Sequence, residues 1–278
     1  MYIFELQYIT KHFPLNKIRG DNNKLKTIIF KSKIMKILID TNIFLDFYRS
    51  NNHAMNIFSE LINHTDKIIL TDQIIQEFDR SRENVIKKVR DNFRKESELE
   101  NFSSSYVQDL KEFKDLLNIK KEYKLKLKEV NDKINQILYD PSIDPIASYF
   151  KNLVDDCIKK DLVLHTTDKI IKKANNRKLI GNPPTSDKHS IGDEINWEII
   201  LANVQDDIII VGRDNTYNNN FAFLKSDYYK HTGCFIHSLT QSITSALEAV
   251  GIQQNPQLID EEKKFIKEIE SRSDFWKY

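Results

Sequence analysis

Five short apolar runs recur along the chain, separated by longer amphipathic stretches. The runs are KILI, KIIL, DLVL, DIIIV and CFIH, at residues 36–39, 67–70, 161–164, 207–211 and 234–237. Near-continuous runs of Val, Ile and Leu are typical of parallel strands that are buried on both faces. Because helical patterns alternate with them, the sequence predicts a three-layer α/β/α fold with a central parallel sheet. The usual strand order for such a doubly wound sheet is 3-2-1-4-5, and we expect it here.

A long stretch without Gly or Pro lies between Gly20 and Pro141. It is rich in Lys, Glu, Leu and Ile, which favour helix. Residues 73–138 are therefore predicted to form two or three long charged helices, with a turn near residues 100–108. Within 113–138 the apolar positions recur mostly every three or four residues, which gives a narrow apolar stripe. We interpret the block as a solvated hairpin packed against the sheet domain, with an RNA-gripping or oligomerising arm as the alternative.

These patterns divide the chain into a core, an insertion and two ends. The predicted core consists of residues 35–78 and 160–250, interrupted by a helical insertion at 79–159. An extension, residues 1–34, precedes the core and lacks the apolar middle and cleavage site of a secretory signal. Residues 251–278 are predicted to form a charged terminal helix or tail.

Composition narrows the class of protein. The net charge of +1 over 278 residues argues against a globally basic nucleic-acid binder, although a local basic rim stays possible. Cys157 and Cys234 are the only cysteines, so neither a disulfide framework nor a Cys-based metal site is expected. This cysteine usage fits a reducing cytoplasm. No apolar run approaches the roughly 18 to 20 residues needed to cross a bilayer.

Two acidic residues follow strands that should be neighbours. In a doubly wound sheet, ligands bind outside the carboxyl ends of the strands, where the strand order reverses. With the order 3-2-1-4-5, the first and fourth strands lie side by side at that reversal. The first ends in ILID, which gives Asp40, and the fourth runs into IIIVGRD, which gives Asp214. The two carboxylates are therefore predicted to share one edge of the sheet.

Two further acids stand near predicted helix starts. Glu77 lies in TDQIIQEFDR, after the second strand, and Asp193 lies in SIGDEINWE, ahead of the fourth. For each of the four acids the plain alternative is a helix cap or a turn residue. Carboxylates that converge on one cleft repel each other unless a cation neutralises them. Oxygen ligands without Cys or an ordered His set favour Mg²⁺ or Mn²⁺ over Zn²⁺.

Four pieces of the chain together resemble the PIN-domain nuclease family, in particular a larger PIN-like group with a helical insertion. The pieces are ILIDTNIFLD, IIQEF, GNPPTSDKHSIGDEINWEIIL and IIIVGRDNTY. The resemblance implies an Mg²⁺- or Mn²⁺-dependent endoribonuclease in which acids hold the metal and activate water to cut RNA. Carried over residue by residue, the catalytic and metal-binding role falls on Asp40, Glu77, Asp193 and Asp214. Asn42 of the DTN motif and Glu198 of the WE pair would support these ligands.

An acidic site needs basic surroundings to accept a polyanion. The predicted RNA contacts are Arg177, Lys178, Lys188 and Arg213. Arg213 stands beside Gly212, where relatives often carry a small hydroxyl residue. Single-stranded RNA is the more natural substrate, because an unpaired strand bends into a narrow cleft and stacks on aromatic side chains. Tyr217, Phe221 and Trp197 could offer stacking, although Trp197 also fits the core.

Three readings of the function follow. The first is an active ribonuclease that acts as a toxin-like or antiphage effector, with an antitoxin or sensor protein as partner. The second is a non-catalytic PIN-like module that binds RNA or protein through the helical insertion, which could also join copies of the chain. The third is an Mg²⁺-dependent phosphatase on a similar sheet. The third is disfavoured because such phosphatases want a second Asp at the position of Asn42.

Overall fold

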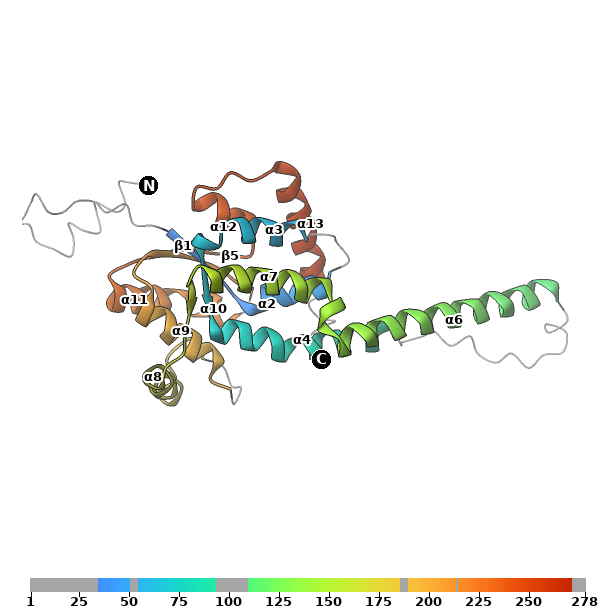
Figure 1. Ribbon diagram of the computed structural model, residues 1–278, viewed down its shortest axis with the longest axis horizontal. Coiled ribbons are helices and arrows are strands. Elements are labelled where there is room, and N and C mark those ends of the chain that lie inside the picture. The colour runs from blue at the N-terminus through green and yellow to red at the C-terminus, as the bar shows by residue number, and fades with distance from the viewer. Residues whose placement is uncertain (1–34, 51–54, 94–109, 186–189, 214, 272–278) are drawn as a thin grey trace, which may run out of the picture. The chain divides into compact units, whose positions relative to one another are not determined.

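The computed structural model describes residues 35–50, 55–93, 110–185, 190–213 and 215–271 (Figure 1). All of them belong to one compact unit, residues 35–278. The predicted extension, residues 1–34, lies outside the described residues, as do Asp214 and Lys188. No helix in the described ranges is both long enough and apolar enough to span a membrane.

The central sheet has the predicted order. Its strands are β1 (Met35–Ile39), β2 (Ile68–Thr71), β3 (Val163–Leu164), β4 (Asp207–Val211) and β5 (Ile236–Thr240). They form one sheet in the order β3-β2-β1-β4-β5, and every pairing is parallel. Each of the five apolar runs therefore marks a strand, which confirms the predicted fold class.

The register of β1 and β4 brings their carboxyl ends to the same edge. The pairing starts at Met35 with Asp207 and continues to Ile39 with Val211. One more hydrogen bond, 2.9 Å from the Asp40 amide to the Val211 carbonyl, extends the ladder to the first residue after β1. The chain thus leaves both strands at neighbouring points.

Helices cover the sheet in two groups (Figure 1). In one group, α9 packs on α4, α8 and α11, and in the other, α3 packs on α7 and α13, and α13 packs on α12. The helices are α2 (Thr41–Leu45), α3 (Asn56–Asn63), α4 (Asp72–Phe93), α6 (Lys111–Tyr139), α7 (Pro145–Lys159), α8 (Asp168–Leu179), α9 (Gly192–Asn203), α10 (Asn215–Asn219), α11 (Phe221–Thr232), α12 (Ile243–Ala249) and α13 (Pro256–Ser271). Short 3₁₀ turns lie at Asp46–Tyr48, Thr65–Lys67 and Pro141–Ile143. The result is the predicted three-layer arrangement.

The core extends into the predicted insertion. The ring of Phe150, in α7, stacks on that of Phe78, in α4, with centroids 3.9 Å apart, and also contacts Phe44. Leu153 and Cys157 of α7 are fully buried. The predicted insertion, residues 79–159, therefore does not coincide with a separate packing unit. The helix α4 continues across residue 79 without a break, and α7 is part of the core.

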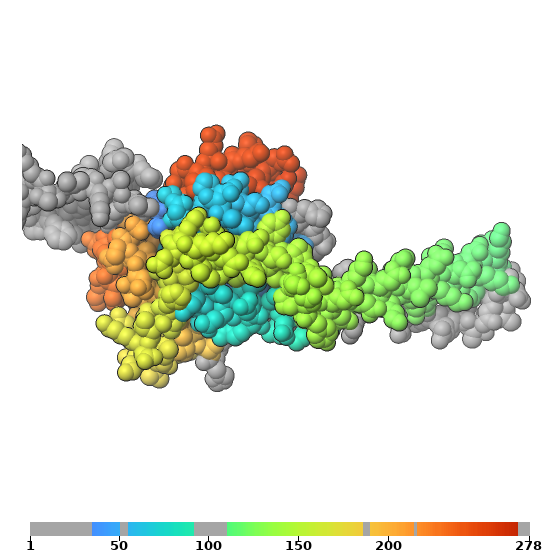
Figure 2. Space-filling model, viewed as in Figure 1, coloured from blue at the N-terminus to red at the C-terminus, as the bar shows by residue number. Residues whose placement is uncertain are grey.

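The projecting part of the insertion is α6, a helix of 29 residues. Its buried residues, Asn131 and Leu138, lie near its C-terminal end, where Arg82 donates to the Ile137 carbonyl over 2.6 Å. The rest of α6 extends away from the sheet, as Figures 1 and 2 show. The long charged helices that the sequence predicts are present as α4 and α6, while the predicted turn near 100–108 lies outside the described residues.

The C-terminal segment, predicted as a charged terminal helix or tail, contains the helix α13, which packs on the core. In α13 the Phe265 ring packs against Phe47, with centroids 4.9 Å apart. Glu262 is only 2% exposed and accepts hydrogen bonds from the amides of Ile243 and Thr244, over 2.6 and 3.0 Å. These amides open α12, so a carboxylate of α13 satisfies the free N–H groups at the start of α12.

Candidate active site

Asp40 is the residue that follows β1, and it is 9% exposed. It occupies the N-cap position of α2, but its side chain makes no capping hydrogen bond to that helix. Its carboxylate instead accepts a hydrogen bond from the Asn42 side-chain amide, over 3.2 Å. The capping alternative therefore does not explain this carboxylate, and Asn42 lies where it can orient it.

Glu77 stands in the second turn of α4. Thr41 donates its hydroxyl hydrogen to Glu77 Oε2 over 3.1 Å. Because Thr41 directly follows Asp40, this bond places Glu77 beside the end of β1. A hydrogen bond that spans 36 positions in the sequence thus joins Glu77 to the residue that follows Asp40.

Asp193 lies in the first turn of α9, which packs against the start of α4. A Cβ at Gly192 would lie 2.7 Å from the side-chain amide nitrogen of Gln73, so the Gln73 side chain packs closely on the first turn of α9. One turn along α9, Asn196 Oδ1 accepts a hydrogen bond from Thr71, over 2.7 Å. These contacts fix the first turn of α9 against the end of β2.

Tyr217, in α10, lies among the acids and is 3% exposed. A Cβ built on Gly212 would lie 3.6 Å from the Asp40 Cβ and 3.7 Å from the Tyr217 ring, so both residues border the same glycine. Burial raises the pKa of Tyr217 well above its usual value, and the negative charges of Asp40, Asp193 and Glu77 raise it further. A hydrogen bond with Asn196 acts in the opposite direction. The negative charges of three of the four predicted acids therefore act on this one buried phenol.

The comparison with protein families agrees with this geometry, since a PIN-domain family model matches residues 37–217 of the 278. The chain belongs to the PIN-domain family. PIN domains are generally nucleases and typically use divalent metals, so the coarse class of the protein is a nuclease-type hydrolase. Neither the comparison with curated proteins nor the comparison with solved structures finds a match.

The donor chemistry of this PIN domain suits a hard divalent cation, because Asp40, Glu77 and Asp193 offer only oxygen. Within the described part of the chain, however, no three His, Cys, Asp or Glu side chains are grouped closely enough to hold a metal ion. The fourth predicted ligand, Asp214, lies outside that part. The donor atoms of these residues suit Mg²⁺ or Mn²⁺, and the assignment of the full ligand set stays a prediction.

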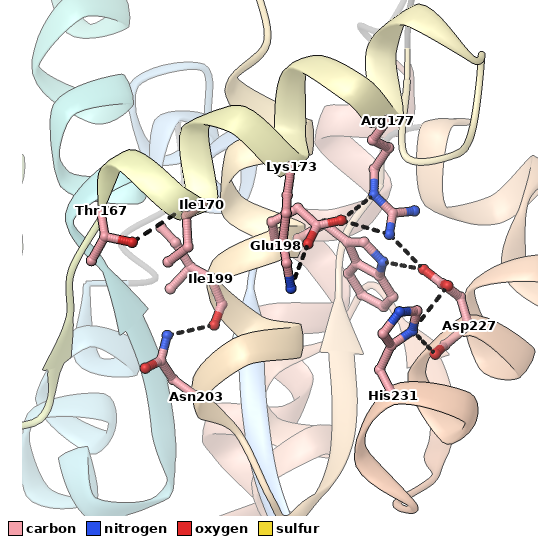
Figure 3. Close-up of polar contacts among 10 residues, drawn as sticks. Thr167, Ile170, Lys173, Arg177, Glu198, Ile199, Asn203, Asp227 and His231 are labelled. Atoms are coloured by element: carbon pink, nitrogen blue, oxygen red, sulfur yellow. Dashed lines mark hydrogen bonds and ion pairs between the residues drawn. The ribbon is translucent and has the colours of Figure 1, made fainter.

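Glu198 lies in a different environment from the acids of this PIN domain (Figure 3). Its carboxylate pairs with Arg177 over 2.8 Å, and Arg177 also contacts Asp227 over 2.9 Å and the Pro183 carbonyl over 2.6 Å. The indole N–H of Trp197 donates to the same Asp227, over 2.9 Å. This buried cluster fastens α8 to α9 and α11. Glu198 therefore supports the packing of α9, in contrast to its predicted support of the metal ligands.

The predicted RNA contacts are mostly engaged inside the protein. Arg177 is 6% exposed in the cluster just described. Arg213 forms an ion pair with the buried Asp46, and its guanidinium lies 5.4 Å from the centre of the Phe265 ring. Lys178 lies 3.4 Å from the buried Glu194. We therefore remove Arg177 and Arg213 from the predicted RNA contacts.

The predicted stacking residues also change. Trp197 is fully buried, as its alternative assignment to the core predicts, and Tyr217 is 3% exposed. Neither side chain can stack on a base, which leaves the half-buried Phe221. Two residues of the site, Asn196 and Thr71, do not stand out in the sequence. The one signal for Asn196 is its spacing of three from Asp193, which puts both on one face of α9.

Proposed function

We propose that this PIN domain is a metal-dependent ribonuclease that hydrolyses phosphodiester bonds in single-stranded RNA. The observation that supports the proposal is the position of Asp40, Glu77 and Asp193 around the buried Tyr217. Carboxylates that face one partly desolvated site repel each other, and a cation bound among them would offset that repulsion. Such an arrangement is costly for a protein that only packs its core, and it is useful for one that binds a metal ion.

Asp40, Glu77 and Asp193, together with Asp214, would hold Mg²⁺ or Mn²⁺. The metal supplies stabilisation of the negative charge on the phosphoryl oxygens and a lower pKa for an attacking water. The protein's own contribution is to position these acids. Thr41 hydrogen-bonds Glu77, and Asn42 hydrogen-bonds Asp40. Asn196 hydrogen-bonds the buried Tyr217, on which the charges of three of the acids act. The expected products carry a 5′-phosphate and a 3′-hydroxyl.

We further propose that the enzyme is a toxin-like or antiphage effector in the cytoplasm, restrained by an antitoxin or sensor protein. The two free, buried cysteines suit a reducing compartment. A second candidate is a PIN-like module that binds RNA without cutting it. The finding that favours this candidate is that the described carboxylates do not form a metal site by themselves.

The test is an RNA cleavage assay with matched variants. Purified protein is incubated with end-labelled single-stranded RNA and Mn²⁺, and a second sample contains excess chelator. Asp40→Asn and Glu77→Gln should abolish cleavage, while Glu83→Gln, an exposed acid on the same helix, should retain it. Binding without cleavage by the wild-type protein would favour the second candidate. Cleavage that persists in Asp40→Asn protein would indicate a contaminating nuclease and remove the support for this site.

A further inference from the structure

A nuclease of this kind needs positive charge along the path of its substrate. Three of the four basic residues that the sequence pointed to are engaged within the protein: Arg177 and Arg213 form buried ion pairs, and Lys178 contacts Glu194. The fourth, Lys188, lies outside the described residues. Guanidinium groups in such pairs are not available to phosphate. A second source of positive charge for the substrate is therefore sought on another surface.

One concentration of positive charge in the described part of the chain lies on α6. Between Lys114 and Lys128 the helix carries six lysines and two acidic residues, although the whole chain has a net charge of only +1. These fifteen positions belong to the portion of α6 that precedes its buried contacts at Asn131 and Leu138. Figure 2 shows this portion, in green, extending away from the body of the protein.

Three of the lysines form a stripe along one face. Lys114, Lys121 and Lys128 are spaced by seven residues, a spacing that drifts by only about 20° per repeat around a helix. The helical rise of 1.5 Å per residue puts successive members about 10 Å apart and the outer two about 21 Å apart. All three are exposed, and within the described residues none of them forms a salt bridge.

Apolar surface accompanies the charge. Ile119 and Leu125 are each 63% exposed and Tyr123 is 55% exposed. Sequence-tolerant binding of unpaired strands combines a basic track for the backbone with side chains on which bases stack. Leu125 lies on the face of the lysine stripe, four residues after Lys121 and three before Lys128, so this face offers both charge and apolar surface.

We propose that α6 is an RNA-binding arm, in which Lys114, Lys121 and Lys128 contact the phosphates of a single-stranded RNA. The proposal rests on the proposed ribonuclease function, because the arm would bring the substrate of the acidic site to the protein. A second copy of the chain is a poorer occupant, since two such lysine-rich segments repel each other. The polyanion is the partner whose charge complements the stripe.

The test compares two triple variants of the full chain. The arm variant carries Lys114→Gln, Lys121→Gln and Lys128→Gln, and the control variant carries Lys230→Gln, Lys263→Gln and Lys267→Gln, at exposed positions of α11 and α13. Glutamine keeps a helix propensity close to that of lysine, so α6 should persist, which circular dichroism checks. Affinity for a fluorescent single-stranded RNA is measured in excess chelator over a series of salt concentrations.

The arm variant should bind about 10- to 100-fold more weakly at 0.1 M salt, and its salt slope should fall by about 2, because each lost phosphate contact removes about 0.7. The control variant should match the wild type. Equal binding by the arm variant and the wild type would overturn the proposal, as would an equal loss in both variants. A change in oligomeric state caused by the arm variant, with RNA affinity unchanged, would identify a protein interface instead.

The same proteins separate this proposal from the ribonuclease function. With Mn²⁺ added, the arm variant should show a higher KM on a long RNA and an unchanged kcat. Absence of cleavage by the wild type would refute the ribonuclease proposal, and the binding measured in chelator would still decide the role of α6.

Discussion

The hydroxyl of Thr41 donates a hydrogen bond to Glu77 across 3.1 Å and thereby joins the end of β1 to α4. Thr41 follows Asp40, whose amide is bonded to the Val211 carbonyl in β4. A carboxylate of α4 is thus oriented by the same short segment that carries the carboxylate after β1. This relationship makes Thr41 a positioning residue for the site.

Thr41→Val should lower RNA cleavage by about tenfold, because a hydrogen bond to a charged group contributes about 1.5 to 3 kcal/mol and its loss frees Glu77 to turn. Thr41→Ser keeps the hydroxyl and should restore most of the activity. The measurement is kcat/KM on labelled RNA, with the thermal unfolding midpoint as a check on the fold. Equal activity of the valine and serine variants would show that the hydrogen bond has no role in positioning.

Tyr217→Phe should reduce cleavage and leave the fold intact. The substitution keeps the buried ring beside Gly212 and removes the hydroxyl that hydrogen-bonds Asn196 amid the three acids. The matched control is Tyr228→Phe, which removes a hydroxyl bonded to the Asp206 carbonyl over 2.6 Å and lies in the Trp197 region. Both variants should lose about 1 kcal/mol of unfolding free energy. Only Tyr217→Phe should lower kcat, and equal effects on kcat would contradict the role of Tyr217.

The sequence predicts the sheet well because the strand signal is local. Each buried strand is a short run of β-branched and aliphatic residues, and the order of the strands follows from general rules of doubly wound folds. The positions of Asp40 and Glu77 follow from the same rules, since each stands just beyond a recognisable strand. The assignment of these acids to a metal site stays a prediction.

The sequence does not show which residues far apart along the chain form ion pairs or pack together. Arg177 and Lys178 look like two exposed basic residues of one helix end, yet Arg177 pairs with carboxylates from α9 and α11. In the same way α7 and α13 read as charged helices, while one face of each carries the rings Phe150 and Phe265 into the core. Such outcomes depend on which helices pack together, and a one-dimensional charge pattern does not contain that information.

Arg177→Met should destabilise the protein strongly. The substitution leaves Glu198, 6% exposed, and Asp227 without their shared guanidinium, and removal of one partner from a buried ion pair costs about 3 to 5 kcal/mol. Lys178→Met is the control, because Lys178 lies 3.4 Å from Glu194 and its side chain is 22% exposed, in contrast to the buried Arg177. Chemical denaturation measures both. If Arg177→Met retained its stability and lost RNA affinity, the original assignment of Arg177 as an RNA contact would be correct after all.

Cys157 should be unreactive in the folded protein at pH 8. Its side chain is fully buried in α7, and burial raises the pKa of the thiol to about 11 from an ordinary value of 9.0. Only about 0.1% of the thiol is then ionised at pH 8, and the thiolate is the reactive form. A thiol reagent should therefore modify Cys157 slowly in buffer and rapidly in denaturant, as mass spectrometry of the labelled peptide would show.

The same shift makes a prediction about stability. The unfolded thiol loses its proton near pH 9 and the native thiol near pH 11, so between these values the folded state binds more protons than the unfolded state. The free energy of unfolding should therefore fall as the pH rises from about 9 to about 11, and the Cys157 contribution is fully present below pH 9. Cys157→Ala protein should show a shallower decline over that range in chemical denaturation. A decline as steep as that of the wild type would mean that other groups, and not this thiol, set the alkaline limit of the fold.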